Sequence, residues 1–154
     1  MKVKAIMLFL AVCLVGAGVS FAADVYTGTW KLNEAKSKLS PNTAKNSTVV
    51  YEDAGDSVKV TIDGTDAAGK PTHNEWTGKF DGKDYPVTGD PASDTRALKT
   101  ITDHKLSFTV KKGDKVTQSG TIVVSPDGKT RTLTASGTSA NGNKFSITAI
   151  YDKQ

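Results

Sequence analysis

Apolar and polar side chains alternate strictly in several short runs of this chain. The alternation is clearest over residues 57–63, 105–111 and 144–151, where every second side chain is apolar. A period of two places successive side chains on opposite faces of a β-strand. A helical period is confined to residues 34–39, which predict one or two helical turns. The pattern therefore predicts an all-β protein whose strands each have one buried and one exposed face.

Turn-forming residues separate these runs at short, regular intervals. Gly, Asn and Asp supply the positive φ that tight hairpins need, and Pro pre-sets the φ of a turn position. The expected turns lie at residues 53–56, 63–71, 81–84, 88–91, 102–104, 112–114, 125–128 and 141–143. With a first strand at residues 27–33, this spacing predicts a meander of about ten antiparallel strands.

A meander with one apolar face must bury that face and protect its two edge strands. Closure into an up-and-down barrel does both. We therefore predict a single small antiparallel barrel domain over residues 23–154. A two-sheet sandwich is the alternative, although it usually needs longer, crossing connections. Pro86 cannot donate to a ladder, so we expect its strand to be an edge, a bulge or a loosely paired segment.

The N-terminus predicts a secretory signal peptide over residues 1–22. Lys2 and Lys4 precede an uncharged apolar run at residues 5–19, and Ala22 ends a small-residue cleavage site. The run is too short for a stop-transfer helix, and no second apolar span follows it. We expect export to the periplasm or the medium, with no transmembrane segment in the mature chain.

Composition narrows the function classes further. The only cysteine, Cys13, lies in the predicted signal peptide, which excludes a thiol enzyme, a cysteine–zinc site and a disulfide-stapled miniprotein. Val12 is a poor residue before a lipoprotein cysteine, so we do not expect a lipid anchor at Cys13. The net charge of +4 falls when Lys2 and Lys4 are removed. The mature chain then gives no reason to expect a nucleic-acid partner.

The sequence points to no catalytic constellation, metal site or cofactor. His73 and His104 are the only histidines, and both are expected at the surface. Two surface histidines do not make a metal site without a third ligand. The chain also has no G-x-S-x-G elbow of a hydrolase. Catalysis is therefore the function class with the least support.

Bulky side chains that the alternating pattern places on the inward face of their strands are the candidates for lining or filling the barrel. Small barrels are often filled by side chains, but large apolar residues are sparse here, which suits a partly open interior. We predict a binding module for a small apolar or amphipathic ligand; the alternative is a filled barrel with a structural or protein-interaction role. The tentative ligand-binding residues are Trp76, Phe80, Tyr85, Phe108, Arg131, Phe145 and Tyr151.

Gly28-Thr29-Trp30 resembles the G-x-W signature of lipocalins and fatty-acid-binding proteins, the calycin group of barrels. The resemblance implies that Gly28 and Trp30 belong to one closed barrel end, where a late arginine packs across the tryptophan ring. Arg131 is the candidate for that role. A second interpretation is that Arg131 meets a ligand carboxylate, because a buried guanidinium offers a planar pair of donors.

The chain also departs from the fatty-acid-binding pattern at two places. Those proteins have a two-helix lid after the first strand, whereas residues 34–48 have room for at most one short helix. They also have an arginine in the last strand that binds a carboxylate, and the segment Ala149-Ile150-Tyr151 has none. The resemblance therefore implies neither a lid nor that particular carboxylate site.

Overall fold

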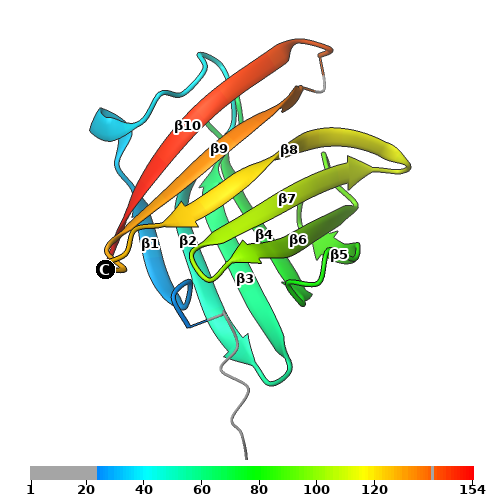
Figure 1. Cartoon of the computed structure of the whole chain (residues 1–154). Coiled ribbons are helices and arrows are strands. Elements are labelled where there is room, and N and C mark those ends of the chain that lie inside the picture. The colour runs from blue at the N-terminus through cyan, green and yellow to red at the C-terminus, as the bar shows by residue number, and fades with distance from the viewer. Residues whose placement is uncertain (1–23, 140) are drawn as a thin grey trace, which may run out of the picture.

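The strands form one closed antiparallel barrel (Figure 1). The computed structural model describes residues 24–139 and 141–154. The hydrogen-bonding order is β1-β10-β9-β8-β7-β6-β5-β4-β3-β2, and β1 also pairs with β2. In chain order the elements are β1 (Gly28–Leu32), the 3₁₀ turn η1 (Glu34–Lys36), β2 (Lys45–Ala54), β3 (Ser57–Thr65), β4 (Pro71–Gly78), β5 (Tyr85–Thr88), β6 (Thr95–Thr102), β7 (Lys105–Lys112), β8 (Lys115–Val124), β9 (Thr130–Thr138) and β10 (Lys144–Lys153).

The predicted meander and its closure are confirmed. Each strand pairs with its neighbours in the chain, and the β1–β10 ladder, which includes Trp30 opposite Lys153, joins the two ends of the sheet. The sandwich alternative is excluded, because all ten strands described belong to one sheet. The period-two pattern sets the inward face: Val58, Val60 and Ile62 of β3 are buried. Closure satisfies the edge strands that an open sheet would expose.

The β5 seam is the weakest part of the barrel ladder. β5 has four residues and pairs at two register positions with β4 and at two with β6. Pro86 lies within it and removes one donor, so the loosely paired strand predicted from that proline is confirmed. The preceding connection supplements the seam, since Gly82 N–H donates to Leu98 O at 2.8 Å and Thr100 N–H donates to Phe80 O at 3.1 Å.

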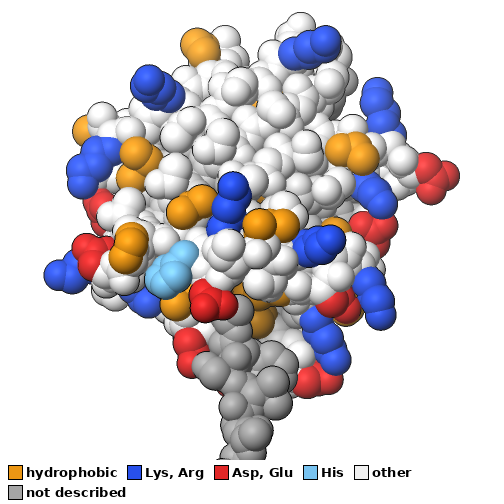
Figure 2. Space-filling model, in the orientation of Figure 1, with side chains coloured by type: hydrophobic (Ala, Val, Ile, Leu, Met, Phe, Trp, Pro, Cys, Tyr) orange, Lys and Arg blue, Asp and Glu red, His pale blue; other side chains and the backbone are white. Residues whose placement is uncertain are grey.

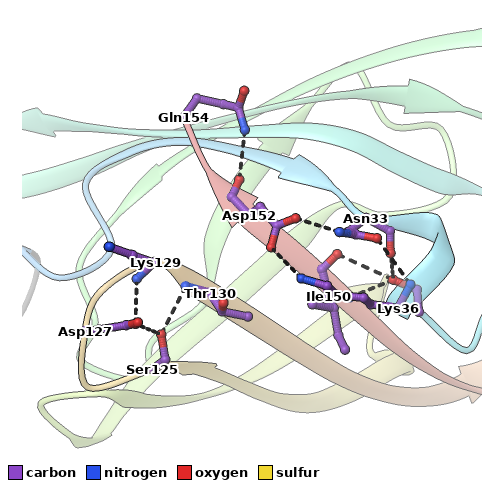
Figure 3. Close-up of polar contacts among 10 residues, drawn as sticks. Asn33, Lys36, Ser125, Asp127, Lys129, Thr130, Ile150, Asp152 and Gln154 are labelled. Carbon is purple, nitrogen blue, oxygen red and sulfur yellow. Dashed lines mark hydrogen bonds and ion pairs between the residues drawn. The ribbon is translucent and has the colours of Figure 1, made fainter.

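The connection between β1 and β2 contains a single helical turn. Asn33 begins η1, and its Oδ1 accepts from Lys36 N–H at 3.2 Å. The same side chain donates from Nδ2 to Asp152 Oδ2 at 2.6 Å, which ties η1 to β10 (Figure 3). Residues 33–45, all of them described, hold no other helix. The expectation of at most one short helix, with no two-helix lid, is confirmed.

The barrel has two unlike ends. We define the closed end by the fully buried Tyr26, Trp30, Leu106 and Val124, which pack together in the apolar core. The open end carries the β1–β2, β3–β4, β5–β6, β7–β8 and β9–β10 connections. Figure 1 shows the β7–β8 and β9–β10 turns projecting on the side away from the chain's C-terminus.

The N-terminal predictions cannot be compared with this fold. The expected signal peptide and Cys13 lie outside the described residues. Within residues 24–139 and 141–154, no helix has the length and apolar character needed to cross a membrane.

Candidate ligand-binding cavity

A cavity of about 1100 Å³ occupies the open end of the barrel. Its mouth is formed by loop residues from the five connections at that end. Its wall is formed by the inward side chains of the strands. The apolar wall residues are Leu32, Val49, Val60, Ile62, Leu98, Phe108, Val110, Ile122, Leu133, Phe145, Ile147 and Ala149. The inward face of the alternating pattern thus lines space at this end and packs solidly at the other.

Four of the predicted ligand-binding residues line this cavity. Phe108 comes from β7, Arg131 from β9, and Phe145 and Tyr151 from β10. They meet here because an antiparallel register places Tyr151 opposite Arg131. Their role in binding remains a prediction, and the structure shows that they share one cavity wall.

The other three predicted residues, Trp76, Phe80 and Tyr85, lie outside the cavity wall. Trp76 is buried, and its Nε1 donates to Arg96 O at 2.8 Å. Its ring meets Tyr85 edge-on, with 5.9 Å between centroids. Phe80 packs edge-on against Tyr26 at 5.7 Å. Trp76 belongs to the core beyond the cavity, and the partly buried Phe80 and Tyr85 pack against that core. The alternating pattern gives the face of a strand on which a side chain lies, and it does not give the height of that side chain along the barrel.

Gly78 explains why the Trp76 and Tyr85 rings fit together. A Cβ on Gly78 would lie 2.6 Å from Trp76 Cζ2 and 2.6 Å from Tyr85 Cγ. Only glycine leaves that space to the two rings. In the sequence this packing is marked only by a single glycine at the end of a strand, from which the two rings beside it could not be predicted.

Trp30, the tryptophan of the G-x-W segment, is one of the four residues that define the closed end. It is 0 % exposed, and its Nε1 donates to Tyr26 O at 2.7 Å. Gly28 has a φ of +119°, and Lys153 Cε would lie 3.0 Å from a Cβ there. The cation over the Trp30 ring is Lys153, with Nζ 5.1 Å from the centroid, in place of the Arg131 that we expected.

Arg131 lies instead between two tyrosines of the cavity. Its Cζ is 4.8 Å from the Tyr151 ring centroid and 5.5 Å from that of Tyr51. Its Nη2 donates to Tyr51 Oη at 3.1 Å. The residue is 2 % exposed, and its Nε and Nη1 have no hydrogen-bond partner. Burial also raises the pKa of the Tyr151 phenol above its ordinary value, and the Arg131 charge partly offsets this.

Arg96 is a second cavity arginine that our sequence reasoning missed. It comes from β6, and its Nη2 donates to Asn74 Oδ1 at 3.2 Å. Removal from water lowers the pKa of the Arg96 guanidinium, and the positive charge of Arg131 acts in the same direction. The sequence did contain a sign of its inward position: Arg96 is two residues before the buried Leu98, so both side chains lie on the same face of the strand.

The charged residues at the mouth are partly paired. Lys45 Nζ lies 2.8 Å from Glu34 Oε2, and Lys112 Nζ lies 2.7 Å from Asp94 Oδ1. Figure 2 shows basic side chains at the upper side of the molecule, near the β9–β10 turn, and most of the acidic ones lower down.

The structure offers no metal site among the residues it describes. No group of three or more His, Asp, Glu or Cys side chains is arranged to hold an ion there. His73 points outward, with its Nδ1 2.6 Å from Asp63 Oδ1. His104 Nδ1 lies 3.2 Å from Val124 O. Neither histidine lines the cavity.

Comparison with known proteins yields similar solved structures only. No known family matches the chain, and no curated protein does either. The redesigned β-barrel mFAP1 bound to DFHBI is 16 % identical, covering 87 % of this chain and 100 % of that one, with a TM-score of 0.46. A de novo designed fluorescence-activating β-barrel is 13 % identical, covering 86 % of this chain and 97 % of that one, with a TM-score of 0.48. Similarity at this level leaves the function to be argued from the cavity.

Proposed function

We propose that the protein is a binding module that holds one small apolar or amphipathic molecule inside the barrel. The observation that carries this is the cavity of about 1100 Å³, lined by apolar side chains and open at one end. Ligand sites are typically concave, largely apolar and provided with a few convergent polar groups. The apolar wall together with Arg96, Arg131 and Asn74 fits that description.

The alternative of a filled barrel acting through its surface has less support. Side chains fill only the closed end, and the open end keeps its space. Ile101, Val116 and Val123 are the large apolar side chains exposed in the part of the chain described. Single exposed apolar residues are ordinary on a protein surface. A relationship to lipocalins and fatty-acid-binding proteins stays a proposal, supported by Gly28 and Trp30 at the closed end.

An environment-sensitive hydrophobic dye tests the proposed function. Burial of apolar surface at about 25 cal/mol per Å² makes micromolar affinity reachable for a drug-sized molecule. We expect saturable binding to the native protein with one site. Ala149→Phe should abolish it, because Ala149 is a buried wall residue and the added ring would occupy the cavity.

Ile101→Phe is the matched control for that experiment. Ile101 is 52 % exposed, so the same ring is added outside the barrel and dye binding should be unchanged. A dye that does not saturate on the folded wild-type protein, or that ignores Ala149→Phe, would overturn the proposal. The filled-barrel alternative would then be preferred.

We also propose that the protein is exported after cleavage at Ala22. The support is the sequence alone: Lys2 and Lys4, the apolar run at residues 5–19, and the small residue at the cleavage site. The intact mass of the protein recovered from its own host checks this. A mass beginning at Ala23 is expected, whereas a full-length mass, or a lipid attached at Cys13, would contradict it.

A further inference from the structure

The cavity wall changes from polar to apolar along the barrel axis. Strands β4, β6 and β8 all begin at the open end, because the β3–β4, β5–β6 and β7–β8 connections lie there. Asn74, Arg96 and Gln118 lie toward the beginning of these three strands, and all three line the cavity. We call these three residues the polar layer.

Apolar side chains follow the polar layer toward the closed end. The next side chain on the same face is the buried Trp76 after Asn74, and the buried Leu98 after Arg96. On β8 the inward face continues to Ile122, which is also buried. Trp76 Nε1 donates to Arg96 O at 2.8 Å, so the indole lies directly beyond the polar layer. The inner part of the wall therefore suits a hydrocarbon chain.

The polar layer keeps hydrogen-bond donors for a molecule in the cavity. Arg96 Nη2 donates to Asn74 Oδ1 at 3.2 Å, which leaves the amide N–H groups of Asn74 unused. Among the residues that the structure describes, the buried side-chain atoms without a hydrogen-bond partner belong to Tyr26 and Arg131. The remaining N–H groups of Asn74 and Arg96 are therefore accessible. None of the described residues binds the side-chain amide of Gln118.

Arg131 offers no comparable donors at the inner end of the cavity. Its Nε and Nη1 have almost no accessible surface, and its Nη2 donates to Tyr51 Oη at 3.1 Å. In register it lies opposite Val124, which belongs to the closed end. A ligand with one polar end therefore finds more free donors near the mouth than deep in the barrel.

The polar layer favours an uncharged polar group over an acid. Two of its three side chains are amides, which carry no charge. Burial lowers the pKa of the Arg96 guanidinium, whereas the charge of Asp90 in the β5–β6 loop raises it. Asp90 also lines the cavity, so an acid bound there would face a second carboxylate. A carbonyl oxygen accepts N–H groups without bringing a charge out of water.

We propose that the cavity binds an amphiphile with its head toward the mouth, where an uncharged ester or amide carbonyl accepts hydrogen bonds from the polar layer. This inference rests on the proposed function and specifies the head chemistry and the orientation of its ligand. The hydrocarbon chain points toward the closed end and packs against Leu98, Phe108 and Ile122. The head stays next to water, so a larger substituent on it can extend through the open mouth.

The two tryptophans report the orientation of a bound chain. Trp30 and Trp76 are both buried beyond the cavity, on the side of the closed end. A nitroxide quenches the fluorescence of a nearby indole. We expect methyl stearate labelled near its chain end to quench the wild-type protein more strongly at saturation than methyl stearate labelled beside the ester. Stronger quenching by the label beside the ester would overturn the proposed orientation.

Methyl dodecanoate and dodecyl methyl ether test the carbonyl site, because they differ only in the carbonyl oxygen. Displacement of the environment-sensitive dye gives both affinities. A neutral hydrogen bond is worth about 2- to 10-fold in affinity, and we expect the wild type to prefer the ester by that factor. Gln118→Leu should reduce the preference. Ser119→Leu is the matched control, because Ser119 is exposed on the outer face of the same strand, and its preference should equal that of the wild type.

The outcomes separate this inference from the proposed function. Equal affinity of the wild type for ester and ether overturns the carbonyl site, and tighter binding of dodecanoate than of the ester overturns the uncharged head. A dye that saturates but that none of these chains displaces overturns this inference alone. If the dye does not saturate either, the proposed function itself fails. The comparisons on the wild type need no variant to fold.

Discussion

The closed and open ends of the barrel use the same alternating strands for different purposes. At the closed end Tyr26 and Trp30 are fully buried, and the indole of Trp30 donates to Tyr26 O. Toward the open end the inward side chains surround a cavity. Between the two, Arg131 lies opposite Val124 and has two nitrogens without a hydrogen-bond partner, and the Tyr26 hydroxyl of the closed end also lacks one. Polar groups left unsatisfied in an interior are unfavourable unless a ligand or water meets them. The two ends therefore differ in packing: apolar side chains fill the closed end, and the candidate site occupies the cavity toward the other.

The largest expected effect separates the ends by truncating one ring in each. Trp30→Ala should cost about 3–5 kcal/mol of unfolding free energy, because it leaves a hole in a packed core. Phe145→Ala should cost clearly less, because Phe145 is only half-buried and already borders the cavity. Chemical unfolding of both variants checks this. Equal losses would show that the ends do not differ in packing.

A pair of glycine substitutions makes the same comparison on a smaller scale. Gly78→Ala should cost about 1–3 kcal/mol, because its Cβ would collide with the Trp76 and Tyr85 rings. Gly142→Ala, in the β9–β10 turn, meets no atom within 4 Å and should cost about 1 kcal/mol for its positive φ of +80°. Tryptophan fluorescence should shift in Gly78→Ala alone. A shift in both variants would contradict the assignment of the rings to the closed end.

Lys153 offers a smaller test of the closed end. Lys153→Met should cost about 0.5–1 kcal/mol, because it removes the cation over the Trp30 ring but keeps an aliphatic side chain. Lys144→Met at the open end is the control, since Lys144 lies over no aromatic ring described in the structure. Thermal melts of the two variants should differ. Identical melts would mean that the Lys153 contact contributes nothing measurable.

The smallest effect concerns acid sensitivity, which we expect at both ends. The Lys112 side chain and Gly113 N–H hold the pKa of Asp94 below its usual range. At the closed end, Ser125 and Lys129 N–H do the same for Asp127 (Figure 3). A depressed pKa contributes stability above the unfolded value of about 3.9, and this is lost as pH falls below it.

Asp94→Asn and Asp127→Asn should therefore each flatten the decline of stability with falling pH, measured by unfolding between about pH 5 and 2. Near neutral pH each variant should be slightly less stable than the wild type. An unchanged slope in either variant would contradict the assigned contacts of that carboxylate. Because both carboxylates are exposed, salt should weaken the effect.

Much of the fold and part of the site could be predicted from the sequence. Alternation over residues 57–63 and 105–111 identified the strands, and the turn residues between the runs set the meander. The period-two alternation placed Phe108, Phe145 and Tyr151 on the inward face of the strands, where they line the cavity. These properties are local: a strand's period and a turn's φ depend on neighbouring residues.

The height of each inward side chain along the barrel could not be predicted from the sequence, because it depends on the three-dimensional register of all the strands. Trp76 shares the inward face with Phe108 but packs beyond the cavity. Height depends on the register and tilt of the strands, which closure sets for the whole barrel at once. The same closure brings Lys153 of the last strand over Trp30 of the first, and leaves Arg131 and Arg96 facing one cavity. The local pattern of residues was enough to predict an antiparallel meander with one apolar face, whereas closure and register, which depend on all ten strands described, set which part of that face packs and which part stays open.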